Sequence, residues 1–255
     1  MNNMNLKFYI VSYDECRDMV FDKLSPEEKN KICCYAVNQS HSKRISPNVN
    51  VINEWDLNNY DSIYQDYQYY EYSFIAHSFL NQSLTNNLSH IGLLHYDVAF
   101  DPGSVNRIIK EFESNPNQIQ YMFYIRDPKS LYMSRTALDN ICQFMSSKLK
   151  LFINSNHIWN EGFIGYSMAI APVHIFQNFG KFMAENHEEI EDIIRTDKWS
   201  INEYGQHRPC GLVERMWGFY LLSTGLPLKK ISGIIHDSSP YTQKAWGEDL
   251  KTFKI

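Results

Sequence analysis

The chain has 255 residues, which is long for one domain and short for two full-sized ones. Its 44% hydrophobic and 21% charged residues are typical of a globular protein and exclude a disordered or fibrous chain. The formal net charge of -5 argues against a broad nucleic-acid-binding face, which would have to be basic. We therefore expect no nucleic-acid partner.

The sequence shows no targeting or membrane segment. Its first residues lack the basic and then apolar pattern of a signal peptide. No apolar run reaches the roughly eighteen residues that a bilayer requires. The five cysteines match no zinc or disulfide pattern, and Cys33 and Cys34 lie in an apolar run that favours buried thiols in a strand. We expect a reducing, cytoplasmic location.

Short apolar runs alternate with segments that carry apolar residues at helical spacing. In chain order, the predicted elements are a strand at 6–12, a helix at 15–24, strands at 32–37 and 49–52, a helix at 71–88, a strand at 91–97, a helix at 105–112, a strand at 120–126, a helix at 131–149, a strand at 163–170, helices at 172–182, 185–200 and 212–223, and a strand at 228–235. Polar segments at 38–50, 58–70, 154–162 and 202–211 are typical of loops. This order predicts an α/β fold, with a mixed, mostly parallel sheet flanked by helices in one domain over 1–255.

The predicted strand Ile91–Asp97 is apolar until its polar end, which carries His95 and Asp97. Open α/β sheets bind ligands at the carboxyl ends of their strands. Side chains alternate along a strand, so His95 and Asp97 are expected on one face. A carboxylate there suits a divalent cation. A lone His-x-Asp is a weak motif. An equally good interpretation is that Asp97 caps a turn and His95 is a buried structural imidazole.

A second candidate is Glu214, which lies with Arg215 near the start of the predicted helix 212–223. There it is a general base or a ligand for an acceptor hydroxyl. Alternatively, it sits at the rim of the helix, where the N-terminal dipole favours a negative charge.

Two further sites are suggested by the residues alone. His236 ends an apolar segment and is either a metal or phosphate ligand or a structural histidine. Gly162 and Gly165 flank a strand start, where glycine permits close approach to a sugar or phosphate, or simply a tight turn. The phosphate-binding loops of kinases and dehydrogenases are missing from the sequence, as are the G-x-S-x-G and H-E-x-x-H motifs. Their absence weakens the case for those classes, for α/β-hydrolases and for zinc proteases.

Several segments, taken in order, resemble glycosyltransferases of capsular and surface polysaccharide synthesis. They are Tyr70–Asn81 with the following Ile91–Tyr96, then Met168–Phe176, and finally Arg208–Leu221. Ile91–Tyr96 resembles a strand that ends in Gly-Leu-x-His-Tyr, and Arg208–Leu221 resembles an Arg-x-x-Gly-x-x-x-Glu-Arg-Leu helix. The likeness covers roughly residues 70–236, and the ordered set is more specific than any one piece.

The resemblance implies a GT-A fold, with a nucleotide-binding half at 1–100 and an acceptor-binding half at 101–255. It implies catalytic roles for Asp97 and Glu214. Metal ligands are implied at Asp97, His236 and His95. Contacts to the nucleotide sugar are implied at Ser12, Tyr13, His95, Tyr96, Gly162 and Gly165.

The sequence departs from the family pattern at three positions. The usual metal motif is Asp-x-Asp, whereas His95 takes the first place here. Relatives often have Arg after His-Tyr, whereas this chain has Asp97. The usual acidic pair near the acceptor is Glu-Asp, and here Arg215 follows Glu214.

We therefore expect a glycosyltransferase that moves a sugar from a nucleotide-sugar donor to a glycan or other hydroxyl acceptor, assisted by Mn²⁺ or Mg²⁺. One alternative is a non-catalytic carbohydrate- or partner-binding domain on a GT-A scaffold, whose exposed tyrosines around 60–72 would stack on sugars. A weaker alternative is a nucleotidyltransferase. It would need a basic, glycine-rich loop after the first strand, where Ser12–Glu15 is acidic instead.

Overall fold

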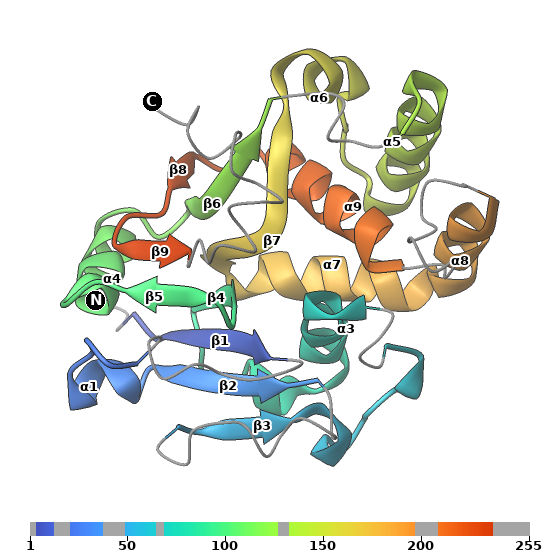
Figure 1. Ribbon diagram of the computed structural model, residues 1–255. Coiled ribbons are helices and arrows are strands. Elements are labelled where there is room, and N and C mark those ends of the chain that lie inside the picture. Colours follow the sequence, from blue (N-terminus) through green and yellow to red (C-terminus); the bar gives the residue numbers. More distant parts are fainter. Residues whose placement is uncertain are drawn as a thin grey trace.

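A seven-stranded sheet forms the centre of the molecule, with strand order β3-β2-β1-β4-β7-β6-β8 (Figure 1). The computed structural model describes residues 4–12, 21–37, 49–64, 69–126, 133–196 and 209–236. The strands are β1 (Leu6–Ser12), β2 (Ile32–Ala36), β3 (Val51–Asn53), β4 (His90–His95), β6 (Ile119–Ile125), β7 (Phe163–Pro172) and β8 (Leu228–Lys230). Within this sheet only β7 runs against the others, since it pairs antiparallel with both β4 and β6. The predicted α/β, mostly parallel sheet is confirmed.

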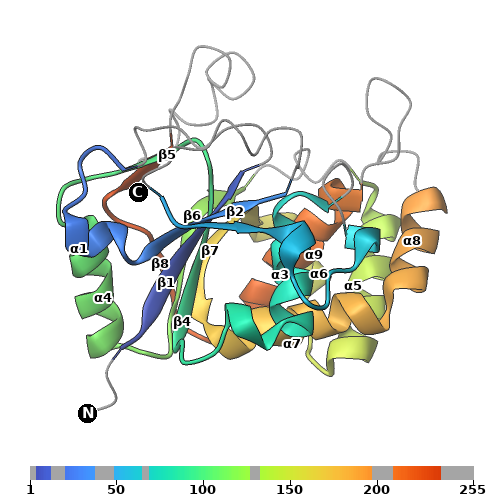
Figure 2. The same ribbon diagram turned by 90° about the horizontal axis from the view of Figure 1, so that it is seen from below.

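Helices cover both faces of the sheet (Figure 2). One face packs against α3 (Glu71–Leu80), α5 (Arg135–Leu149), α7 (Val173–Glu185), α8 (His187–Thr196) and α9 (Pro209–Ser223), with α6 (Ser155–Glu161) beside α5. The other face packs against α1 (Pro26–Lys29) and α4 (Ser104–Ser114). The central strands are buried on both sides, which explains why their sequences read as continuous apolar runs. Cys33 and Cys34 are buried in β2 as thiols, as expected.

A second, two-stranded sheet pairs β5 (Val98–Phe100) with β9 (Ile234–His236) in antiparallel register. Val98 lies opposite His236. This pairing brings the backbone of the last described residue beside the turn that follows β4.

Helix α9 approaches β7 so closely that only glycine fits at the contact. A Cβ atom on Gly218 would lie 1.9 Å from the carbonyl oxygen of Ile164. One residue earlier, Trp217 is buried, and its Nε1 donates a hydrogen bond of 3.1 Å to the carbonyl oxygen of Ser167 in β7. The distance between α9 and β7 is therefore set by backbone contact.

We predict that Gly218→Ala lowers the free energy of unfolding by about 2–3 kcal/mol, because the added methyl must displace α9 or β7. Chemical denaturation followed by circular dichroism measures the change. Asn140→Ala, at an exposed position of α5, controls for the gain in helix propensity. A Gly218→Ala protein as stable as this control would contradict the packing argument.

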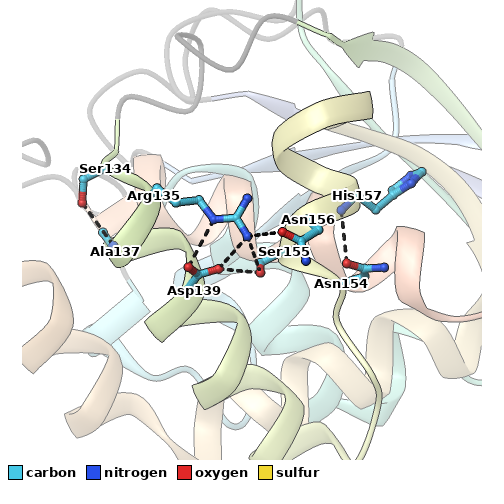
Figure 3. Close-up of polar contacts among 8 residues, drawn as sticks. All are labelled: Ser134, Arg135, Ala137, Asp139, Asn154, Ser155, Asn156 and His157. Carbon is cyan, nitrogen blue, oxygen red and sulfur yellow. Dashed lines mark hydrogen bonds and ion pairs between the residues drawn. The ribbon is translucent and has the colours of Figure 1, made fainter.

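The structure corrects the predicted loop at 154–162, most of which is helix α6. Asn154 caps this helix, since its side chain accepts a hydrogen bond of 3.1 Å from the backbone N–H of His157. Arg135 joins α5 to α6, because its guanidinium donates hydrogen bonds of 3.3 Å to Ser155 and 2.6 Å to Asn156 (Figure 3). A short helix joined to its neighbour by side chains carries too few apolar residues to show helical periodicity.

Other boundaries differ by less. The helix predicted at 71–88 ends at Leu80, and Pro172 closes β7 instead of opening the next helix. The helix predicted at 15–24 falls largely outside the described residues. None of the described helices is both long and apolar enough to cross a membrane.

Candidate functional site

Strand β4 ends at His95, and Tyr96 and Asp97 form the turn that leads into β5. The prediction that the strand continues to Asp97 was wrong, so strand alternation does not place His95 and Asp97 on one face. The turn lies where β4 leaves the carboxyl edge of the parallel strands, which is the edge expected to bind ligands. His95 lies beside Val11 of β1 in the strand register.

A carboxylate to which the sequence assigned no role faces His95. Glu71 is the first residue of α3, and its Oε1 lies 3.2 Å from Nε2 of His95. Both side chains are largely buried, with 12% and 17% of their surface exposed. A helix-initial glutamate is ordinary in sequence, because the helix dipole favours it there. The contact with β4 distinguishes Glu71 from a surface cap, and that contact is visible only in the folded chain.

Glu71, Asp97 and Glu214 form one electrostatic group, called here the acidic cluster. Burial raises the pKa of Glu71, the nearby His95 opposes this rise, and the charges of Glu214 and Asp97 add to it. Carboxylates that influence one another in this way share a low-dielectric space. Two predicted site residues from distant parts of the chain, Asp97 and Glu214, thus both lie within electrostatic range of Glu71.

The carboxylate of Glu214 is held at both oxygens. Its Oε1 accepts a hydrogen bond of 3.0 Å from the backbone N–H of Tyr166, and its Oε2 lies 3.2 Å from the guanidinium of Arg215. Arg215 also donates at 2.9 Å to the carbonyl oxygen of Gly211, one turn earlier in α9. Arg215, which departs from the resembled sequence pattern, is therefore a cation that pairs with Glu214.

Strand β7 bulges where it meets Glu214. Tyr121 pairs with Ala169 and Phe123 with Gly165, so three residues of β7 stand opposite Met122 alone. Bulges commonly redirect a strand next to active sites. Here the bulge directs the N–H of Tyr166 towards Glu214.

The two predicted glycines serve the packing of β6 against β7. A Cβ atom on Gly162 would lie 2.2 Å from the carbonyl oxygen of Ile125, and one on Gly165 would lie 2.3 Å from the Cδ1 atom of Ile125. The close approach that glycine permits is thus to β6. Gly165 still adjoins the site, because its Cβ would be 3.9 Å from Oε1 of Glu214.

The remaining predicted residues have varied positions. Ser12 is buried at the end of β1, where its carbonyl accepts from Val37. Tyr13 lies outside the described residues, and for His236 the backbone position alone is described. The expectation of exposed tyrosines around 60–72 was wrong for three of them, which are buried in the core: Tyr64, Tyr69 and Tyr72.

For a divalent cation, the donor atoms at the turn are suitable. Carboxylate oxygen and imidazole nitrogen are ligands that Mn²⁺ accepts, and Asp97, His95 and the backbone of His236 meet at this turn. The described side chains alone form no group of three ligands placed to hold a metal ion. A three-ligand site at the turn would therefore need a side chain beyond those that the structure describes.

A buried polar network fixes α3, the helix that supplies Glu71. Nε2 of His77 accepts from the backbone N–H of Asp61 at 3.1 Å, and its Nδ1 contacts the hydroxyl of Tyr35 at 3.1 Å. Ser73, one turn earlier, bridges His77 and the buried Glu54. The network joins α3 to β2 and to the segment after β3.

This network predicts a pH dependence of stability. Burial lowers the pKa of His77 from 6.5 to about 4, so the unfolded chain binds a proton there that the folded chain does not. Relative to its value above about pH 6.5, the free energy of unfolding falls by up to roughly 3 kcal/mol as the pH drops towards 4. We expect urea denaturation to show a weaker pH dependence between 4 and 6.5 for His77→Gln. The exposed His157→Gln should keep the wild-type dependence, and equal slopes in all three proteins would contradict the assignment.

Comparison with solved structures supports the fold. The WbbM bifunctional glycosyltransferase in its apo form superposes with a TM-score of 0.57 at 11% identity, over 93% of this chain and 46% of that one. This chain thus spans less than half the length of that structure. Glucosyl-3-phosphoglycerate synthase from Mycobacterium tuberculosis aligns with a TM-score of 0.44 at 8% identity, over 94% of this chain and 75% of that one. No protein-family model matches the chain, and no curated protein matches it in sequence. The chain thus shares its overall α/β fold with the WbbM structure.

Proposed function

We propose that the protein transfers a sugar from a nucleotide-sugar donor to a hydroxyl of an acceptor, which we take to be a glycan. The observation that carries this proposal is the acidic cluster, in which Glu71 contacts His95 at the end of β4 and lies within electrostatic range of Asp97 and of Glu214 on α9. The fold shared with the WbbM glycosyltransferase structure supports it. The resemblance to polysaccharide glycosyltransferases supports the same reaction.

Glu214 is suited to act as the general base of an inverting transfer. In that reaction the acceptor oxygen attacks the anomeric carbon, the bond from this carbon to the donor diphosphate breaks, and the nucleoside diphosphate leaves. The acceptor hydroxyl gives its proton to a carboxylate. The Tyr166 N–H and Arg215 fix both oxygens of Glu214, which limits the orientations from which it accepts that proton.

Asp97 and His95 lie at the end of β4 that faces the donor in this proposal. Together with His236, they would hold Mn²⁺ or Mg²⁺. A bound cation supplies charge neutralisation for the departing diphosphate. Glu71 orients the His95 imidazole through their 3.2 Å contact.

We predict that UDP or GDP, or one of their sugars, binds the protein, and that Mn²⁺ strengthens the binding. Isothermal titration calorimetry with and without Mn²⁺ measures both effects. Absence of binding by every nucleotide and nucleotide sugar in the panel would rule out the proposed function. Binding that is unchanged by Mn²⁺ would remove the cation from the proposal and leave the transfer itself standing.

We predict that Glu214→Gln lowers kcat at least 100-fold while the affinity for the donor changes little, since the amide cannot accept the proton. Asp97→Asn should instead weaken the Mn²⁺-dependent part of donor binding. Release of nucleoside diphosphate measures turnover. Glu113→Gln, an exposed change on α4, is the matched control. Wild-type turnover by Glu214→Gln would exclude Glu214 as the base.

A further inference from the structure

Unusual backbone conformations converge on the acidic cluster. Among the described residues other than glycine, five have a positive φ, namely Tyr70, Asn87, Lys150, Tyr166 and Ser167. Asn tolerates this conformation, and Lys150 is the C-cap of α5, where it is common. The other three lie beside the site. Such conformations are energetically unfavourable and persist only where the surrounding structure enforces them.

Each strained segment lies next to one carboxylate of the acidic cluster. Tyr70, with φ of 46° and ψ of -118°, immediately precedes Glu71 at the start of α3. Tyr166 and Ser167, with φ of 62° and 51°, form the β7 bulge whose N–H binds Glu214. The strain thus lies on both sides of the acidic cluster.

One buried hydrogen bond joins the two strained segments. The hydroxyl of Tyr72, two residues after Tyr70, shares a hydrogen bond with the hydroxyl of Ser167. Both residues are almost fully buried. The carbonyl of Ser167 also accepts from Trp217, three residues beyond Glu214 in α9. Ser167 therefore connects α3, β7 and α9 at one point.

The electrostatic environment of Tyr72 is consistent with this link. Burial raises the pKa of Tyr72 well above its usual value, and the charges of Glu214 and Glu71 raise it further. The phenol therefore stays protonated and keeps its hydrogen bond to Ser167. Leaving a buried hydroxyl without a partner is unfavourable, so the pair is held together.

We propose that Tyr72 and Ser167 are positioning residues whose hydrogen bond fixes the distance between Glu71 and Glu214. The inference rests on the proposed function, since it assigns the two carboxylates to the donor and acceptor sides of one reaction. The link ties α3, which holds His95 through Glu71, to the bulge that holds Glu214. Loss of either hydroxyl lets the bulge relax and moves the Tyr166 N–H away from Glu214.

The test compares Tyr72→Phe, Ser167→Ala and the double variant in donor hydrolysis and transfer. We expect kcat to fall 10- to 100-fold in each single variant, because misplacement of about 1 Å has effects of that size. The donor KM should stay within about twofold of wild type. The double variant should be no slower than the slower single variant, since both changes remove one link.

Tyr9→Phe is the matched control. The hydroxyl of Tyr9 is also buried and donates at 2.6 Å, but to the carbonyl of Leu84, away from the acidic cluster. This variant should lose as much thermal stability as Tyr72→Phe and retain wild-type kcat. Ser167→Gly, which relieves the positive φ while removing the hydroxyl, provides a second route if Tyr72→Phe does not fold.

The outcomes separate the two proposals. If wild-type protein turns over no donor, the proposed function fails and the positioning role fails with it. If wild-type protein is active and Tyr72→Phe matches Tyr9→Phe in kcat, the positioning role alone is overturned. Multiplicative losses in the double variant would also overturn it, because independent sites combine in that way.

Discussion

The backbone contact between α9 and β7 is the constraint on which the rest of the site depends. Gly218 lets the helix rest on the carbonyl of Ile164, and the same helix carries Trp217 and Glu214. Because protein interiors are packed as densely as organic crystals, a helix that contacts a strand at its backbone cannot shift without a compensating change elsewhere. The close packing at Gly218, one turn further along α9, therefore fixes the position of the Glu214 carboxylate.

Much of the fold was predictable because the central strands are buried on both faces. Residues 6–12, 32–37 and 163–170 read as strands from continuous apolar runs, and the structure has β1, β2 and β7 there. Helix α6 was missed, since its caps and its attachment to α5 are polar contacts made after folding. The tyrosines of 60–72 appeared exposed in sequence because their neighbours are polar, yet tertiary packing buries three of them.

The candidate site was predictable in part. Asp97 and Glu214 were expected at one site from an ordered resemblance, and both lie within electrostatic range of Glu71. Their functional roles stay a prediction. Glu71 and the bulge at Tyr166 and Ser167 were not foreseen. Tyrosine and serine do not favour a left-handed conformation, so their sequence carries no sign of it. The conformation is held by hydrogen bonds to α3 and α9. Such tertiary contacts leave no pattern in the local sequence.

The small sheet of β5 and β9 has a consequence for how the molecule assembles. Val98 and His236 are paired although every element from α4 to β8 lies between them in the chain. Closing so long a loop is entropically unfavourable until the intervening elements have docked, so this pairing belongs to a late folding step. During synthesis, the turn at Asp97 emerges well before its partner strand exists. In the proposed function this turn faces the donor, so we expect that end of the site to be completed only after β9 has paired with β5.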